Sequence, residues 1–262
     1  MYDYNVVVCG CTKNSASYIK AHLTKLYKLK DAFKTVQFVI YENDSMDPTV
    51  QILEEFKKTH SGFDYIHENG VDQRFYQRPE RIAHGRNRLL EYIQKSEYDY
   101  MIMIDLDSVL ELFTHEQMQA IFKHDVNTWD GLTANCIGRY YDIWALRIDS
   151  VWDHSIHGSL WKSPIDYDCW VKVRFFGDKK KYIGDNQIHI PGNSPLIPVN
   201  SAFGGFGIYK MSCIKGCVYN AHDGNVVTCE HVEFHRQLKE KNGARLFICP
   251  TFFVQGQPEH LV

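Results

Sequence analysis

The feature that most constrains the fold is a regular alternation of strand-like and helix-like segments along residues 1–107. Short β-branched and aromatic runs predict strands at 4–9, 35–41, 63–67 and 98–104. Apolar residues at helical spacing predict helices between them, at 15–29, 50–60 and 81–94. This alternation is typical of a parallel sheet covered by helices, in which ligands bind outside the carboxyl ends of the strands. We therefore expect an α/β protein with its functional residues at those strand ends.

The second part of the chain is less regular. Its patterns predict helices at 114–124 and 230–241, and strands at 208–209 and 244–254. Residues 129–176 are rich in Trp, Tyr, Asp and Gly and show no long helical periodicity, so they could form a substrate surface. Residues 178–198 contain several Gly and Pro and predict an irregular loop, a candidate lid. Within it, we expect Lys179–Lys181 to be a solvated face.

The charge balance excludes one class of function. The chain carries 29 Lys and Arg against 32 Asp and Glu, a formal net charge of −3. There is therefore no general positive field to hold nucleic acid or an anionic membrane. The longest uncharged apolar run in the first half, Tyr100–Ile104, is far shorter than the ~20 residues that a spanning helix needs. We expect neither nucleic-acid binding nor a transmembrane segment.

The amino-terminal residues and the cysteines favour a cytoplasmic location. The chain begins with an acidic residue, Asp3, and a strand pattern, without a basic leader or a long apolar stretch. Its 8 Cys residues form no Cys-x-x-Cys pairs and no disulfide-scaffold rhythm. This pattern indicates reduced, buried thiols.

Two acidic residues, Asp105 and Asp107, follow the last of the four strand patterns directly. Both carboxylates are expected to emerge at the carboxyl end of a buried strand, where they would attract a divalent cation. Mn²⁺ and Mg²⁺ prefer carboxylate oxygens and complete their shells with water and substrate phosphates. The pair therefore predicts a Mn²⁺ or Mg²⁺ site for a diphosphate ligand. The alternative is that both acids only turn the chain and cap the next helix.

An alternating half that ends in an apolar strand and Asp-x-Asp resembles the nucleotide-diphosphosugar glycosyltransferases of GT-A type. The resemblance implies one GT-A type, Rossmann-like domain over residues 1–262, with a mixed central sheet flanked by helices. It also implies a nucleotide-sugar-binding half at 1–107 and an acceptor-binding half at 108–262.

Two further segments resemble donor-binding parts of that family. Residues 42–49 are similar to the turn after the second strand, where an acid contacts the base or ribose; the resemblance gives this role to Glu42, with Asp44 second. Residues 81–88 are similar to the helix start from which an Arg approaches the diphosphate or the metal-binding acids, and Arg86 matches best. Without the resemblance, these would be turn, cap and surface residues.

A finer resemblance concerns residues 141–147 and 203–209, which are similar to the branch of fungal capsule-type α-1,3-mannosyltransferases and related microbial or viral enzymes. It implies that Gly204 and Gly205 lie at the substrate. The alternative is that these glycines only allow strands to approach closely.

Aromatic residues supply the hypothesis for the acceptor, because aromatic rings stack on the apolar faces of sugars. The candidates are Tyr140, Tyr141, Trp144, Trp152, Trp161 and Trp170. Large aromatics bury ~150–250 Å² each and mostly serve packing, so we select Trp144 as the ligand contact. Asp142 and Arg147 are expected to hydrogen-bond sugar hydroxyls.

Residues 229–235 allow two interpretations. The resemblance places Glu230 where many inverting relatives hold the general base, and His231 near the donor phosphates or the metal, although those relatives have Glu-Asp where this chain has Glu-His. Alternatively, His231 and His235 lie one helical turn apart and could form a zinc pair. A zinc hydrolase would need Glu directly after the first His, where this chain has Val232. His260 is a further candidate metal ligand.

The resemblance, together with these residues, implies a metal-dependent glycosyltransferase that moves a hexose from a nucleoside diphosphate sugar to a hydroxyl of a glycan or glycoconjugate. Asp105 and Asp107 would anchor Mn²⁺ or Mg²⁺, with Arg86 assisting. One alternative is a sugar nucleotidyltransferase, although residues 9–14 hold only one Gly and one Lys of the basic Gly-rich loop expected there. The other alternative is a glycan-binding module without catalysis.

Overall fold

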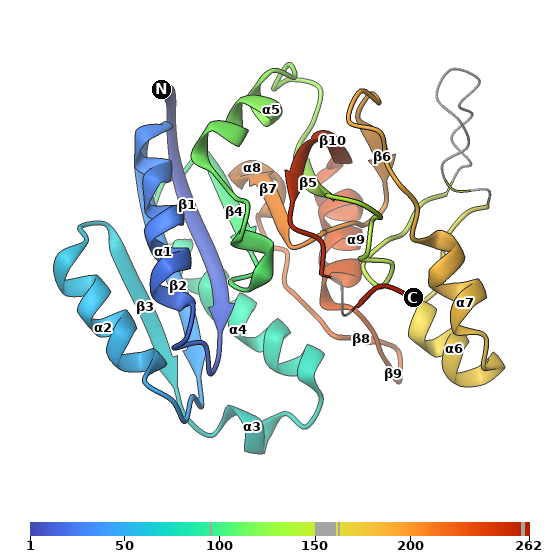
Figure 1. Ribbon diagram of the computed structural model, residues 1–262, viewed down its shortest axis with the longest axis horizontal. Coiled ribbons are helices and arrows are strands. Elements are labelled where there is room, and N and C mark those ends of the chain that lie inside the picture. The colour runs from blue at the N-terminus through green and yellow to red at the C-terminus, as the bar shows by residue number, and fades with distance from the viewer. Residues whose placement is uncertain (95, 150–160, 162, 258–259) are drawn as a thin grey trace.

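A mixed β-sheet forms the centre of the molecule, as the computed structural model in Figure 1 shows. The structure describes residues 1–94, 96–149, 161, 163–257 and 260–262. The strands are β1 (Tyr2–Thr12), β2 (Phe33–Asn43), β3 (Phe63–Glu68), β4 (Tyr100–Ile104), β5 (Gly131–Cys136), β6 (Ile197–Val199), β7 (Phe206–Lys210) and β10 (Leu246–Val254). Over the described ranges this is an 8-stranded sheet in the order β3-β2-β1-β4-β7-β5-β10-β6.

The strand directions divide the sheet into two parts. β3, β2, β1 and β4 pair in parallel, so the carboxyl ends of β1, β2 and β4 lie along one edge. β7 then runs antiparallel to both β4 and β5, while β10 is parallel to β5 and antiparallel to β6. This confirms the expected single α/β domain with a mixed central sheet flanked by helices.

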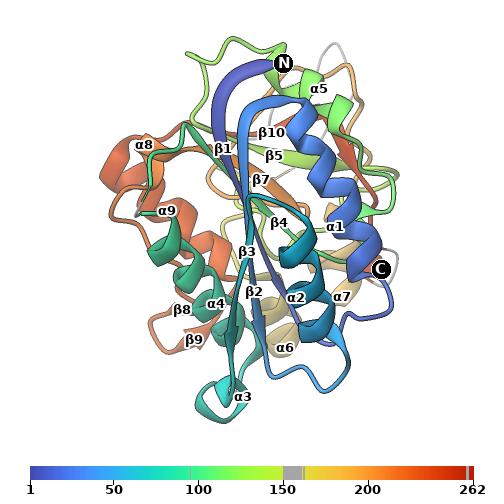
Figure 2. The same ribbon diagram turned by 90° about the vertical axis from the view of Figure 1, so that its left-hand side faces the viewer.

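Helices cover both faces of the sheet. They are α1 (Ile19–Tyr27), α2 (Thr49–Thr59), α3 (Val71–Arg74), α4 (Arg78–Ile93), α5 (Met118–Phe122), α6 (Cys169–Phe176), α7 (Lys179–Tyr182), α8 (Met211–Ile214) and α9 (Glu230–Asn242). Figure 2 shows α1 and α2 on one face and α4 and α9 on the other, where the latter two pack together. A small ribbon, β8 (His222–Asp223) with β9 (Val226–Val227), lies before α9. Among the described residues, no helix has both the length and the hydropathy to cross a bilayer.

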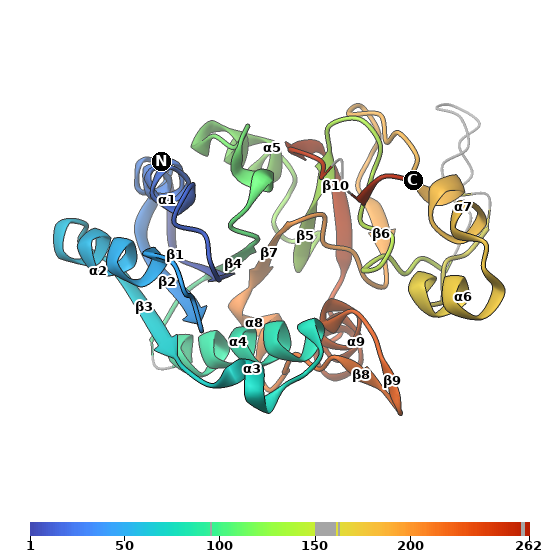
Figure 3. The same cartoon turned by 60° about the horizontal axis from the view of Figure 1, so that its bottom comes forward.

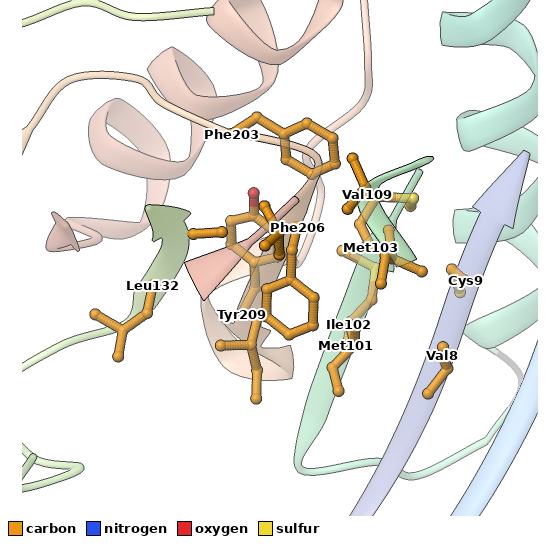
Figure 4. Close-up of a cluster of buried hydrophobic side chains, with 14 of the residues drawn as sticks. Val8, Cys9, Met101, Ile102, Met103, Val109, Leu132, Phe203, Phe206 and Tyr209 are labelled. Atoms are coloured by element: carbon orange, nitrogen blue, oxygen red, sulfur yellow. The ribbon is translucent and has the colours of Figure 1, made fainter. Parts of the chain in front are cut away.

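Strand β4 is held rigidly in the core. Each of its residues is at most 4% exposed. Figure 4 shows Met101, Ile102 and Met103 between side chains of β1 and the rings of Phe206 and Tyr209 on β7. Because close-packed interiors have few voids, a strand held this way fixes the position of the residues that follow it.

Helix α4 approaches the sheet closely at a glycine. Gln77 and Glu80 form a capping box at its start. A methyl group at Gly85 would lie only 2.5 Å from the ring of Tyr41 and 3.1 Å from the sulfur of Cys11. The absence of a side chain there allows the close contact, and the next residue, Arg86, is thereby carried to the edge of the sheet where β1 and β2 end.

Three local expectations need correction. The helix expected at 114–124 is split into a 3-10 turn, His115–Gln117, followed by the shorter α5. The segment 178–198 is not wholly irregular, because it contains α7 and the start of β6. Strand β5 was not expected at all: it is buried on both faces and so lacks the alternation that reveals half-buried strands.

Candidate active site

Two neighbouring cavities open at the carboxyl ends of the parallel strands. The first, of about 350 Å³, lies between the ends of β1 and β2 and helix α4, with Lys13 and Asn43 in its wall. The second, of about 380 Å³, lies between the end of β4 and the start of α9, and includes Trp144 and Glu230. The residues that line both are Arg78, Ile82, Arg86, Asp105 and Asp107. The two acids predicted from the sequence therefore stand in a wall shared by two cavities.

Asp105 and Asp107 are fixed in different ways. The backbone amide of Asp105 donates to the carbonyl of Gly205 at 2.9 Å, and its Oδ1 accepts a hydrogen bond from Arg86 Nη2 at 3.1 Å. Asp107 accepts from the amide of Val109 at 3.1 Å and from Gln257 Nε2 at 2.8 Å. Asp107 thus caps the turn that follows β4, as the structural alternative predicted, and also lines both cavities.

The surroundings of Asp105 bring its pKa close to neutral. Burial raises the pKa of Asp105 to about 7; Arg86 opposes the rise, and the charge of Asp107 adds to it. A nearby divalent cation would act in the opposite direction, because it stabilises the carboxylate. A proton and a bound cation would therefore compete for this side chain near neutral pH.

Arg86 is the centre of a buried polar cluster. Its side chain is 4% exposed, and its Nη1 donates to Glu230 Oε1 and to His231 Nε2. The guanidinium also lies over the rings of Phe203 and Tyr219, at 5.0 and 5.5 Å from their centroids. Arg86 thus joins α4 to the start of α9, which is not the surface position that the alternative interpretation gave it.

The two histidines of α9 differ in how many of their ring nitrogens have partners within the protein. Burial, with Arg86 adding to it, holds the pKa of His231 well below its usual range, and its Nε2 accepts from Arg86. His235 is fully buried, with Nδ1 at 2.9 Å from Ser201 Oγ and Nε2 at 2.8 Å from Tyr209 OH. Burial lowers the pKa of His235 to about 3, with Arg86 again adding to the effect. His231 lines the second cavity, whereas His235 lines neither.

A zinc pair would need a third ligand. No group of three or more His, Cys, Asp or Glu side chains in the described part of the chain is arranged to hold a metal ion. Both nitrogens of His235 are already engaged by hydroxyl groups. We therefore do not carry His235 into the metal site.

Glu42 and Asp44 lie beside the first cavity but do not line it. Glu42 is completely buried; its Oε1 accepts from the amide of Ser45 at 2.9 Å, and its Oε2 contacts His67. Asp44, at φ 50°, accepts from the amides of Gly70 and Asp72. Both acids organise the turn after β2. The residue between them, Asn43, is the one that reaches the cavity wall.

Trp144 and Arg147 separate in the structure. Trp144 lines the second cavity and donates from Nε1 to Asp168 Oδ2 at 2.6 Å. Arg147 is 9% exposed, and its Nη1 donates to the carbonyls of Trp144 and Leu146, so it braces this loop outside the two cavities. Trp161 is buried in the core, and Trp152 lies outside the described residues.

Gly204 and Gly205 shape the site through their backbone. Their φ angles are 66° and 87°, in the left-handed region that favours glycine. The amide of Gly204 donates to Asp142 Oδ2 at 2.9 Å, and the carbonyl of Gly205 accepts from Asp105. Asp142 lines the second cavity, and burial raises its pKa although the Gly204 amide opposes the rise. A chain of contacts thus joins Asp142 to Asp105.

Several wall residues were not selected from the sequence. Arg78 and Arg81 come from the start of α4, and Lys13 from the end of β1. Gln257 and His260 bring the carboxyl-terminal segment to the second cavity; of these, only His260 was a candidate. The sequence shows only that some of these residues follow a strand or begin a helix. That signal is weak, because the sequence does not show which strand and helix ends come together.

Comparison with solved structures identifies the fold. The mannosyltransferase PcManGT from Pyrobaculum calidifontis, solved with GDP-Man and Mn²⁺, matches with a TM-score of 0.57 and 13% identity, over 97% of this chain and 57% of that chain. S. aureus TarS 1-349 matches with a TM-score of 0.52 and 15% identity, over 98% and 61%. The same fragment in complex with UDP matches with a TM-score of 0.50 and 16% identity, over 98% of this chain and 62% of that chain.

This likeness shows that the chain has the GT-A type glycosyltransferase fold. The chain spans less than two thirds of the length of these structures. No protein-family model matches the sequence, and no curated protein matches it either.

The ion pair between Arg86 and Glu230 gives a test of the cluster. Arg86→Met leaves the buried Glu230 carboxylate without its partner, and we expect unfolding free energy to fall by about 3–5 kcal/mol. Adding Glu230→Gln removes the unpaired carboxylate charge. The unfolding free energy of the double variant should therefore fall by less than the sum of the losses in the two single variants. Urea unfolding of the four proteins measures this coupling.

Arg88→Met is the matched control, because Arg88 lies on the same helix and is 39% exposed. Its loss should cost about 1 kcal/mol or less. Strictly additive losses for Arg86 and Glu230 would contradict the buried pair.

Proposed function

We propose that this protein is a metal-dependent glycosyltransferase that moves a hexose from a nucleoside diphosphate sugar to a hydroxyl of a glycan or glycoconjugate. The observation that carries the proposal is the shared wall, in which Asp105, Asp107 and Arg86 separate a cavity rimmed by cations from one lined by aromatic residues. The same fold solved with GDP-Man and Mn²⁺, and with UDP, supports this class of donor.

The first cavity suits the nucleoside diphosphate. Lys13, Arg78 and Arg81 line this cavity together with Arg86. One guanidinium group can bind two phosphate oxygens at once through two parallel N–H groups. Lys13 and Arg81 both form ion pairs with Asp72, which holds them at the rim. The resemblance assigned the contact with the base or ribose to Glu42 and Asp44. We assign this contact to Asn43, because Asn43 is the residue at the end of β2 that lines the cavity.

Asp105 and Asp107 would hold the cation. Their donor atoms are carboxylate oxygens, and Asp105 Oδ2 accepts no hydrogen bond from the described residues. Two carboxylates suit an ion that completes its shell with water and phosphate oxygens. When bound, Mn²⁺ or Mg²⁺ would stabilise the negative charge on the departing nucleoside diphosphate. Arg86 would contribute to the same stabilisation from the shared wall.

The second cavity suits a sugar acceptor. Trp144 and Trp170 both line it, and Trp144 is held in place by its hydrogen bond to Asp168. An indole ring offers a flat apolar face for a sugar ring. Transfer requires the acceptor hydroxyl to lose a proton as it attacks the anomeric carbon, so a carboxylate of this cavity is the expected base.

Besides the proposed metal ligands Asp105 and Asp107, two carboxylates line the second cavity and could take that proton. Glu230, which the resemblance favours, is engaged by Arg86, and we assign it to positioning. Asp142 binds only backbone amides among the described residues, and burial raises its pKa, which makes it the better proton acceptor. We therefore assign proton removal to Asp142. The finer resemblance to fungal capsule-type α-1,3-mannosyltransferases stays a prediction from residues 141–147 and 203–209.

The donor site is tested by thermal shift. We expect one of a panel of UDP-, GDP- and dTDP-sugars to raise the melting temperature in the presence of Mn²⁺. Asp107→Asn removes one anionic ligand and should abolish this cation-dependent shift while the unliganded protein stays folded. Asp3→Asn is the control, because Asp3 lies at the amino end of β1, opposite the site. A shift by glycan alone would instead indicate a binding module.

Competition between proton and cation at Asp105 gives a pH dependence. Because the pKa of Asp105 is raised to about 7, the side chain is mostly protonated below that pH and charged above it. Mn²⁺ affinity, measured by calorimetry, should therefore rise about tenfold between about pH 6 and about pH 8. Asp105→Asn should bind more weakly and lose this slope. Equal affinity at both pH values would contradict the competition.

The assignment of the base is tested by Asp142→Asn. Once a donor and acceptor are identified, this change should lower kcat by about 10²–10⁴-fold. The donor-induced shift in melting temperature should be retained, because Asp142 lines only the acceptor cavity. A loss of donor binding together with kcat would show that Asp142 only supports the Gly204 turn.

A further inference from the structure

An exposed tip lies at the junction of α6 and α7. Residues 174–181, which we call the α6–α7 tip, form an unbroken run of exposed positions. They include Phe175 and Phe176, whose exposed fractions are 76% and 64%. None of these residues lines the two cavities described above. Exposed phenylalanines side by side are unfavourable in water, which indicates that this tip contacts something else.

The α6–α7 tip is also strongly basic. Its cationic side chains are Arg174, Lys179, Lys180 and Lys181, and its one acid is Asp178. Asp178 is engaged as the cap of α7, where its Oδ1 accepts from the backbone amide of Lys181 at 2.8 Å. Within the described residues, none of the four cationic side chains forms an ion pair. The whole chain has a net charge of −3, so positive charge is concentrated here against the overall balance.

The fold brings the aromatic and basic residues together. Gly177, at φ 74°, ends α6 and reverses the chain into α7. Across this turn, Phe176 packs against Tyr182 with ring centroids 5.8 Å apart, and Lys179 Nζ lies 5.6 Å from the ring of Trp170. Figures 1 and 3 show α6 and α7 at the edge of the molecule, far from β1, β2 and β3.

We propose that the α6–α7 tip binds the surface of an anionic lipid bilayer. Aromatic side chains at a membrane surface enter the headgroup region, while neighbouring lysines and arginines contact lipid phosphates. Clusters of about four to eight Lys and Arg residues on an amphipathic helix are typical of segments that bind anionic lipid. A single-stranded nucleic acid also combines stacking with charge, but its binding uses a groove that follows the backbone. Residues 174–181 line neither of the two cavities described above, and their rings and cations are exposed together.

Attachment through the α6–α7 tip would place the second cavity next to the membrane. Trp170, on α6, and Ile183, directly after α7, both line the second cavity. A membrane at the tip would therefore lie beside the acceptor cavity, where it could present acceptors carried on lipid. This consequence rests on the proposed function, whereas attachment itself does not require donor, metal or catalysis.

Co-sedimentation with vesicles tests the attachment. The purified chain should sediment with vesicles that contain phosphatidylglycerol and stay in solution with phosphatidylcholine alone. Raising the salt from about 0.1 M to about 1 M, which shortens the screening length from about 10 Å to about 3 Å, should release it. The triple change Lys179→Gln, Lys180→Gln, Lys181→Gln should weaken binding roughly 100-fold. The pair Phe175→Ser, Phe176→Ser should weaken it about tenfold.

Matched variants separate the tip from general effects. Lys20→Gln, Lys58→Gln, Lys215→Gln removes as many exposed charges elsewhere, and Leu112→Ser, Val218→Ser removes two half-exposed apolar side chains. Both should bind like the unchanged protein, and circular dichroism melts should show that all variants fold.

Three results would overturn the proposal: no sedimentation with either vesicle, equal loss in the matched variants, or binding to a soluble polyanion such as single-stranded RNA without binding to vesicles. Because the assay omits nucleotide and metal, a failed donor shift would leave its outcome unaffected.

Discussion

The arrangement of this site depends on one buried, positively charged side chain. Arg86 is almost completely buried, and a buried guanidinium is tolerated only when carboxylates and π-faces replace its water. Glu230 from α9 and Asp105 after β4 supply the charges, and Phe203 and Tyr219 supply the rings. The pairing therefore determines where α9 begins relative to β4. The Arg86 side chain also lies in the wall that the two cavities share.

The same pairing sets the electrostatics of Asp105. This carboxylate is placed between Arg86, which favours its charged form, and burial together with Asp107, which disfavour it. The result is a carboxyl group whose pKa is raised to about 7, which would exchange its proton for a cation in the proposed function. An arrangement of this kind binds a cation best when phosphate oxygens arrive with it. Under the proposed function, cation and nucleotide would therefore bind together better than either alone.

The sequence predicted the fold and the strand-end acids better than the detail of the site. Alternating patterns and the buried strand before Asp105 depend on local order, so they can be read directly. Glu42 has the sequence position expected for a donor contact, but its carboxylate accepts a hydrogen bond within the turn after β2. The neighbouring residue, Asn43, lines the cavity instead. Only tertiary contacts decide which of two adjacent side chains points outward. The pairing of Arg86 with Glu230, 144 positions away, has no local signal.

Charge in this molecule acts locally, and its overall value is a poor guide to function. A net charge of −3 excludes a general positive field, yet the cations of the first cavity and of the α6–α7 tip are each concentrated on a few residues. Screening limits the reach of exposed charges to about 10 Å at moderate salt, so distant acids do not cancel such clusters. The Lys179–Lys181 run looks like an ordinary solvated face in the sequence. Its meaning changes once Gly177 places it next to Phe175 and Phe176, because exposed rings beside cations that form no ion pair with the described residues would complement an anionic bilayer surface.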